Sequence, residues 1–188
     1  MAIGKISDFK AALTLGGARP SLFDVTINGP ISSVAGLEAL AKSQYQCTTT
    51  SIPGLTVTPM EKQYFGRTVK LPGEMTFGTL STTFINPEDY GIRKGMESWM
   101  EYINGTELNI AGSVLPADWY GTVKIRQYTK TGDVAIDFDF IDCWPSAVDA
   151  MELNYDTTGA MEEFSVTWEY NYYTSTAQDT STALGDQE

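Results

Sequence analysis

The chain has 188 residues, a formal net charge of -12 and no histidine. All 12 lysines and arginines precede residue 131, whereas the 58 residues from Thr131 onward carry 13 Asp and Glu and no base. Such a one-sign field repels DNA and RNA, and the lack of histidine excludes Ser-His-Asp or Cys-His catalysis and every histidine-based metal site.

A chain of this length can bury one independent core, so we expect a single domain over residues 1–173. Residues 174–188 have no periodicity and are predicted to form a flexible acidic tail. No run of residues is long and apolar enough for a membrane span, and the start lacks the apolar run of a secretory signal, so we expect a cytoplasm-like compartment. Cys47 and Cys143 match no metal-binding spacing and are predicted to be buried thiols.

Period-two alternation and abundant Thr, Val and aromatic residues predict a mainly β protein. The expected strands cover residues 22–27, 45–50, 67–71, 75–84, 122–128, 134–141 and 164–172. Residues 28–42 begin at a Gly-Pro turn and are expected to form a loop with a short helix near its end.

Residues 51–72 are predicted to form a long extended arm interrupted by proline and glycine. Because aromatic residues and arginine often dominate interfaces, we expect this arm to contact a neighbouring subunit, and its alternative is to fold back on its own sandwich. The residues expected to make the contact are Ile52, Pro53, Tyr64, Phe65, Arg67 and Lys70.

One helix interrupts the strands. Asn86 is a suitable N-cap, Pro87 suits the first helical position, and Gly105 can end the helix. Its apolar residues recur at helical spacing and predict a core-facing stripe. These residues are Ile92, Met96, Trp99, Met100 and Ile103.

Carboxylates recur along and just after the strand at residues 134–141, where Asp137, Asp139 and Asp142 form the best candidate constellation for chemistry. This strand has no lysine to protect an open edge. Two carboxylates at this spacing suit a glycosidase or a hard cation, but the pattern lacks the loop glycine and closing glutamate of a calcium site. We therefore expect no enzyme, no metal and no cofactor, and interpret the acids as a solvated electrostatic face.

Several short motifs together resemble the tail tube proteins of contractile-tailed bacteriophages over about residues 18–173. They are Ala18 to Phe23, Gln46-Cys47, Ile52 to Gly54, Arg67 to Val69, the helix around Trp99, Arg126 to Tyr128, Trp144-Pro145 and the strand at 164–168. The loop at 28–42 and the tail after Tyr173 depart from the family pattern.

The resemblance implies an antiparallel β-sandwich or barrel with one flanking helix and a long arm, similar to the Hcp tube protein of type VI secretion. It also implies hexameric rings stacked into a tube inside a contractile sheath. The implied partners are the chain itself, the sheath, baseplate, tail terminator and tape measure proteins, and double-stranded DNA in transit without specific binding. The implied location is the virion tail tube, assembled in the host cytoplasm without a membrane.

Within that architecture, we expect Asp137, Asp139 and Glu169 to face the lumen and repel DNA, or else to face outward as contacts for a basic sheath surface. The arm would meet the acidic part of an adjacent subunit. Other hypotheses are the tube of a secretion or contractile injection system, a carbohydrate-binding β-sandwich suggested by the 12% aromatic content, and a glycosidase that uses Asp137 and Asp139.

Overall fold

A computed structural model describes residues 5–13, 17–30, 36–107, 109–156 and 159–176. The predicted tail beyond residue 176 and part of the predicted loop, at residues 31–35, lie outside these ranges. The elements are α1 (Ile6–Ala12), β1 (Phe23–Asn28), the 3-10 helix η2 (Leu37–Lys42), α2 (Ser43–Gln46), β2 (Cys47–Ser51), β3 (Leu55–Tyr64), β4 (Arg67–Phe77), β5 (Leu80–Ile85), α3 (Gly91–Ile103), the 3-10 helix η3 (Pro116–Asp118), β6 (Gly121–Tyr128), β7 (Val134–Val148), β8 (Glu163–Glu169) and β9 (Tyr172–Ser175).

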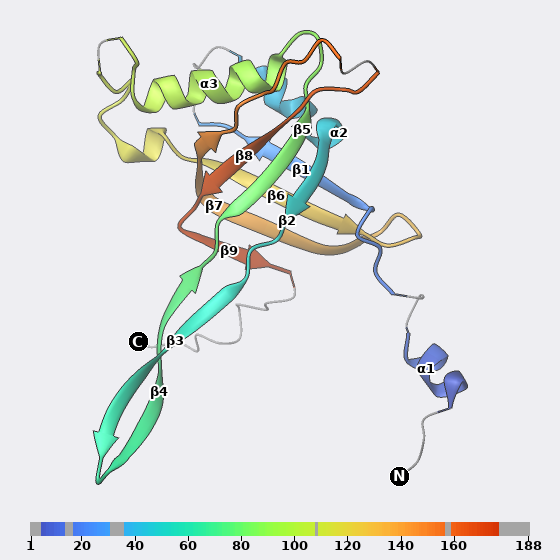
Figure 1. Ribbon diagram of the computed structural model, residues 1–188, viewed down its shortest axis with the longest axis vertical. Helices are drawn as coiled ribbons and strands as arrows, with labels where there is room; N and C mark the ends of the chain where they lie inside the picture. Colours follow the sequence, from blue (N-terminus) through green and yellow to red (C-terminus); the bar gives the residue numbers. More distant parts are fainter. Residues whose placement is uncertain (1–4, 14–16, 31–35, 108, 157–158, 177–188) are drawn as a thin grey trace, which may run out of the picture.

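The body is a sandwich of two antiparallel sheets that share one strand (Figure 1). The first sheet has the order β1-β6-β7-β9, and the second has the order β2-β5-β8-β7. Strands β3 and β4 form a separate two-stranded hairpin that projects from the body. The prediction of an antiparallel β-sandwich with a flanking helix and a long arm is confirmed.

Strand β7 passes from one sheet to the other. Its first part pairs with β6 and β9, and residues 144–148 pair with β8. Asp142, with φ 57°, occupies the left-handed region where the strand changes partners. Residues 138–141 therefore lie between β6 and β9, so this part of the strand is not an open edge.

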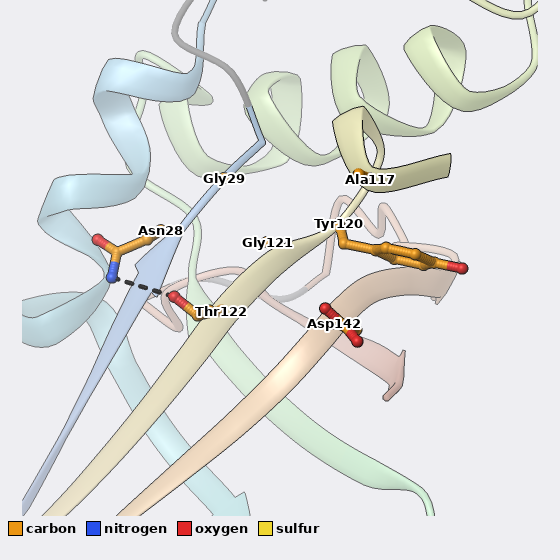
Figure 2. Close-up of a pocket in the computed structure, with 7 residues that line it drawn as sticks. All are labelled: Asn28, Gly29, Ala117, Tyr120, Gly121, Thr122 and Asp142. Atoms are coloured by element: carbon orange, nitrogen blue, oxygen red, sulfur yellow. Dashed lines mark hydrogen bonds between the residues drawn. The ribbon is translucent and has the colours of Figure 1, made fainter. Parts of the chain in front are cut away.

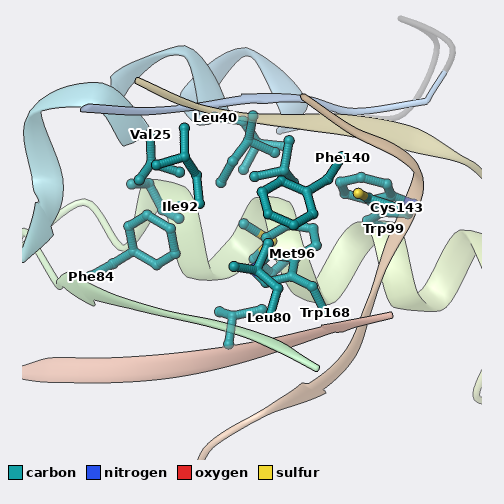
Figure 3. Close-up of a cluster of buried hydrophobic side chains, with 14 of the residues drawn as sticks. Val25, Leu40, Leu80, Phe84, Ile92, Met96, Trp99, Phe140, Cys143 and Trp168 are labelled. Carbon is teal, nitrogen blue, oxygen red and sulfur yellow. The ribbon is translucent and has the colours of Figure 1, made fainter. Parts of the chain in front are cut away.

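The core lies between the two sheets, with α3 closing one side (Figure 3). Trp99 of α3 meets Trp168 of β8 edge to face, with ring centroids 5.7 Å apart. The indole N–H of Trp168 donates to the Thr82 hydroxyl at 2.8 Å, and that of Trp99 donates to the Trp119 carbonyl at 2.9 Å. Both large rings are thus buried without an unsatisfied donor.

The helix begins later than expected. A turn follows Pro87, Tyr90 has φ 54°, and α3 starts at Gly91, whose N–H donates to the Asp89 carboxylate at 3.0 Å. Asn86 is not the N-cap, because its side chain instead donates to Glu162 at 2.7 Å. On the predicted stripe, Ile92, Met96 and Trp99 are fully buried, Ile103 packs against the core, and Met100 is half-buried.

Other boundaries also shift. Tyr45 belongs to α2 instead of the following strand, and the strand expected at 75–84 is interrupted at Gly78 and Thr79. The strand expected at 164–172 is two strands, β8 and β9. Because β9 continues through Ser175, the first two residues of the predicted tail belong to the sheet.

Candidate assembly surfaces

The β3–β4 hairpin exposes apolar residues on both strands. The cross-strand pairs Leu55–Phe77, Val57–Met75 and Met60–Leu71 are joined by the ladder, and each of these six side chains is exposed. A two-stranded hairpin with no partner is marginally stable in water at best. The hairpin therefore presents an apolar surface that the described part of the chain leaves exposed.

The predicted contact residues lie at the tip and at the root of this hairpin. Phe65 (φ 47°) and Gly66 (φ 76°) form a two-residue turn with positive φ at both positions, and the Phe65 ring is 90% exposed. The Tyr64 ring packs edge to face on the Phe65 ring. Lys70 forms an ion pair with Glu61, with 3.3 Å between Nζ and Oε1.

At the root, Ile52 is exposed but Pro53 is buried, and the Gly78 N–H donates to the Gly54 carbonyl at 3.2 Å. The tip is thus exposed, and Pro53 is part of the support at its base. Contact of the arm with a neighbouring subunit stays a prediction.

A bulge changes the register in the middle of the hairpin. Between the pairs Val57–Met75 and Pro59–Pro72, β4 contains one residue more than β3. Gly73 lies in this bulge, where an added Cβ would be 2.4 Å from the Thr58 carbonyl oxygen. Only glycine fits so close to the facing strand.

The outer face of the first sheet is charged but largely neutralised. Lys124 of β6 lies 3.4 Å from Asp137 and 3.3 Å from Asp139, and Arg126 Nε lies 3.3 Å from Asp24. Desolvation lowers the pKa of Lys124, but the hydrogen bond to Asp139 and the charges of Asp139 and Asp137 outweigh it and raise the pKa. The sequence did not predict these cations as partners of the carboxylates, because Lys124 and Arg126 lie on β6 and only the pairing of β6 with β7 brings them opposite Asp139 and Asp137.

Glu169 is not part of this group. It lies at the exposed end of β8, opposite Trp144 in the second sheet, whereas Asp137 and Asp139 lie opposite Arg126 and Lys124 in the first. The structure therefore brings Asp137 and Asp139 together and places Glu169 on another sheet. Their position relative to a lumen stays a prediction.

The outer face of the second sheet is built mainly from small uncharged side chains, most of them hydroxyls, with Glu163 and Glu169 at the two ends of β8. One row across the strands is Thr49, Thr83 and Ser165, and the next is Ser51, Ser81, Thr167 and Ala147. In the first of these rows, the Thr83 and Ser165 hydroxyls are hydrogen-bonded to each other at 3.0 Å. These two hydroxyls thus have partners within the sheet.

The edges of the two sheets differ. The buried Ser43 hydroxyl accepts from the Ile27 N–H at 3.3 Å and donates to the Val25 carbonyl at 3.0 Å, so α2 covers the free side of β1. In the described part of the chain, β2 pairs only with β5, and residues 144–148 pair only with β8. The second sheet therefore has an open strand on each side, and the first has one only at β9.

One pocket of the described residues has a single carboxylate in its lining. This pocket, of about 420 Å³, lies beside the ends of β1 and β6, where Asn28 and Thr122 are hydrogen-bonded at 3.4 Å (Figure 2). The one carboxylate that lines it, Asp142, accepts from the Asn171 side chain at 2.9 Å. This pocket therefore contains no pair of groups for acid-base chemistry.

The remaining candidate groups are engaged or buried. Asp137 and Asp139, the glycosidase candidates, share an ion pair with Lys124. Burial raises the pKa of both Cys47 and Cys143 to about 12, so neither thiol is reactive at neutral pH. Among the described residues, no cluster of His, Cys, Asp and Glu could hold a metal ion, and no helix is long and apolar enough to cross a membrane.

Comparison with known proteins matches the chain to one family. The family model for phage tail tube proteins matches residues 18–176. The tail tube protein gp19 of Enterobacteria phage T4 is 26% identical over 157 residues, which are 83% of this chain and 90% of that protein. The tail tube protein of Serratia phage KSP90 is 27% identical over 167 residues, or 88% of this chain and 93% of that protein.

Two solved structures share the fold at low sequence identity. The tube-terminating cap of the anti-feeding prophage has a TM-score of 0.59 at 14% identity, and the match covers 85% of this chain and 90% of that chain. A chain of the sheath-tube complex of an extracellular contractile injection system has a TM-score of 0.58 at 10% identity, with the same coverage of both chains.

Proposed function

The chain belongs to the family of phage tail tube proteins, and we propose that six copies of it join into a ring and that rings stack into the inner tube of a contractile tail. The observation that carries this proposal is the pair of open strands on the second sheet, because a ring needs one free edge on each side of every subunit. The tube is a conduit for the genome, and this role requires neither catalysis nor a cofactor.

The ring closes through the second sheet in this proposal. Neighbouring strands in the order β2-β5-β8-β7 are antiparallel, so the two outer strands run in opposite directions. Residues 144–148 of one copy can thus pair antiparallel with β2 of the next. Pro145 suits this position, because proline in a sheet is confined largely to edges and bulges. The first sheet cannot close a ring in this way because Ser43 occupies the backbone groups of β1.

A ring closed through the second sheet presents the outer face of that sheet to the bore. The bore is then lined by the rows of Ser and Thr, with Glu163 and Glu169 at the ends of β8. Such a wall carries no cation to bind phosphate, so duplex DNA can pass without specific binding. Of the three carboxylates expected in the lumen, this arrangement puts Glu169 there and turns Asp137 and Asp139 outward, toward a sheath.

The hairpin stacks one ring on the next. It continues from β2 and β5, so it extends beyond the sandwich in the direction of those strands (Figure 1). Its exposed apolar pairs supply the surface that a neighbouring ring would bury. Tyr64, Phe65 and Arg67 at the tip are of the residue types that most often carry interface energy.

The partners follow from this role. The tube contacts a sheath, is nucleated on a baseplate and ends at a terminator protein, while its bore holds the tape measure protein before the DNA. Structures of a sheath-tube complex and of a tube-terminating cap with this fold support these contacts. The subunit is a component of the virion tail and is assembled in the host cytoplasm.

A contractile injection system is a second candidate setting, because a chain of its sheath-tube complex shares the fold. The two settings differ in cargo and not in the subunit. Isolated particles that carry packaged DNA above the tube support the phage, and free particles without a capsid support the injection system.

Removal of the hairpin tests the assembly. Because the Gly54–Gly78 hydrogen bond already closes its root, residues 55–77 can be replaced by a two-residue turn without disturbing the sandwich. By negative-stain microscopy we expect tubes from the full chain and single rings from the shortened chain, with unchanged circular dichroism of the sandwich. Tubes from the shortened chain would show that the hairpin does not stack the rings, and a full chain that stays monomeric would contradict the proposed function.

A further inference from the structure

The N-terminal helix α1 has an apolar stripe that its own chain does not cover. Ile6, Phe9 and Leu13 follow one another at spacings of three and four residues, so they share one side of the helix. They are 75%, 65% and 42% exposed, and no residue of α1 is buried. The helix stands apart from the body (Figure 1) and precedes residues 18–176, over which the family model matches.

Such a helix needs a partner to persist. It has seven residues, and isolated helices of this length are not stable in water. Because an α-helix turns by about 100° per residue, Lys10 lies beside the apolar stripe and Asp8 lies on the opposite side of the helix. Lys5 directly precedes the first turn. The surface that covers α1 should therefore be apolar at its centre and acidic at its margin.

The described part of the body carries a surface that fits this description, which we call the acidic groove. It lies where the chain leaves β7 and enters β8, has a volume of about 520 Å³, and includes Leu153 and Met161, which are 84% and 77% exposed. Three glutamates line it, namely Glu152, Glu162 and Glu163, and none of its lining residues is basic.

The negative charge of the groove is not neutralised by the nearby helix α3. Arg93 pairs with Glu97 and donates to the Asp149 carbonyl, and Lys94 donates to the Asp89 carbonyl. Glu162 accepts from Asn86 through Oε2, while its Oε1 is buried without a hydrogen-bond partner. Uncompensated carboxylates at an exposed apolar surface favour a partner that brings both apolar side chains and bases.

We propose that α1 of one copy lies in the acidic groove of another copy, with Ile6, Phe9 and Leu13 against Leu153 and Met161. Lys5 and Lys10 then approach Glu152 and Glu163. Each subunit carries one such helix and one such groove, so every copy in an assembly can both give and receive a helix. This inference rests on the proposed assembly and adds an intersubunit clamp to it.

Cross-linking between different copies tests the contact. Proteins with Phe9→Cys and with Leu153→Cys are prepared separately, mixed, assembled and oxidised, and the mixed disulfide dimer is measured on a non-reducing gel. Cys143 is buried and Cys47 is half-buried, which limits background. Ala11→Cys, on the opposite side of α1, replaces Phe9→Cys as the matched control. We expect the mixed dimer in large excess over this control.

Charge reversal provides a second readout. Lys5→Glu together with Lys10→Glu should reduce the dimer yield roughly threefold to tenfold, and Glu152→Lys with Glu163→Lys on the other copy should restore it. An unchanged yield overturns the proposal. So does a disulfide that forms only when both cysteines are in one chain, because α1 then occupies its own groove.

Microscopy of the same samples separates the two proposals. Tubes without the mixed dimer overturn the clamp and leave the tail tube function intact. A wild-type chain that forms no rings or tubes overturns both.

Discussion

At the scale of single residues, close backbone approaches fix where each element lies. An added Cβ at Gly121 would be 2.4 Å from the Asn28 carbonyl oxygen and 2.5 Å from the Trp99 ring. Gly121 thus lets the end of β6 pass between β1 and α3. Its buried neighbours cannot retreat without opening the core.

Gly121→Ala should therefore destabilise the sandwich. We expect a loss of about 1–3 kcal/mol in the free energy of unfolding, because a methyl group is forced into a packed core. Gly54→Ala is the matched control, since nothing lies within 4 Å of its added Cβ. Urea unfolding of monomeric protein measures both, and equal midpoints would contradict this packing.

The buried thiols predict a loss of stability at alkaline pH. Desolvation raises the pKa of Cys47 and Cys143 from 9.0 to about 12, so between these values the folded state keeps protons that the unfolded state releases. The contribution of the two protonated thiols to the free energy of unfolding is therefore complete below pH 9. It falls as pH rises toward 12, by about 1.4 kcal/mol per pH unit for each proton retained.

The matching measurement is urea unfolding between pH 8 and 11 for the wild type and for Cys47→Ala with Cys143→Ala. The double variant should be less stable at neutral pH because it loses buried volume, but its stability should fall less steeply above pH 9. Parallel pH profiles would show that the thiols do not cause the loss. Tyr170 remains in both proteins, and burial raises its pKa to about 12 as well.

At the scale of elements, the edge of β1 depends on one hydroxyl. Ser43→Ala removes the partner of the Val25 carbonyl and of the Ile27 N–H. Because buried backbone groups without partners are costly, we expect a loss of about 1–3 kcal/mol in urea unfolding. Ser81→Ala is the control, as its half-buried hydroxyl makes no such bridge. A loss no larger than that of the control would show that α2 does not cover the edge through Ser43.

Much of the element pattern could be predicted from the sequence, because alternation and turn residues act locally. The strands at 122–128 and 134–141 and the apolar stripe of α3 follow directly from periodicity. The start of α3 could not be predicted, since Asn86 binds Glu162, which is 76 residues away in sequence.

Nor could the candidate site be predicted in full. The arm was visible as an extended segment, but its folding into a hairpin depends on the turn at Phe65 and Gly66. The alternation of Asp137 and Asp139 identified a polar face, but the cations opposite them come from a strand whose register only the fold sets. The hydroxyl rows of the second sheet combine residues of three strands, so no local pattern reveals them.

At the scale of the whole molecule, the proposed ring assigns an inside and an outside. Thr83→Cys, on a hydroxyl row, should react in assembled tubes with a small maleimide but not with a maleimide carried on a folded protein too large to enter the bore. Thr174→Cys lies opposite Asp139 on the first sheet and should react with the small maleimide both in the monomer and in assembled tubes. In tubes, the large maleimide should label Thr174→Cys more strongly than it labels Thr83→Cys.

The monomer is the control for this labelling, because both cysteines should react with either reagent before assembly. If the large reagent labels Thr83→Cys in tubes and spares Thr174→Cys, the second sheet faces outward. The bore would then be lined by the charged first sheet, with Asp137 and Asp139 in the lumen as the sequence suggested.

The most direct test of the account is a cryo-EM map of the assembled chain at a resolution that separates strands. We predict a ring of six copies in which β2 of one copy pairs with residues 144–148 of the next, with the hydroxyl rows facing the bore and the hairpin inserted in the adjacent ring. A ring joined through β1 or β9, or subunits without any shared strand ladder, would contradict it.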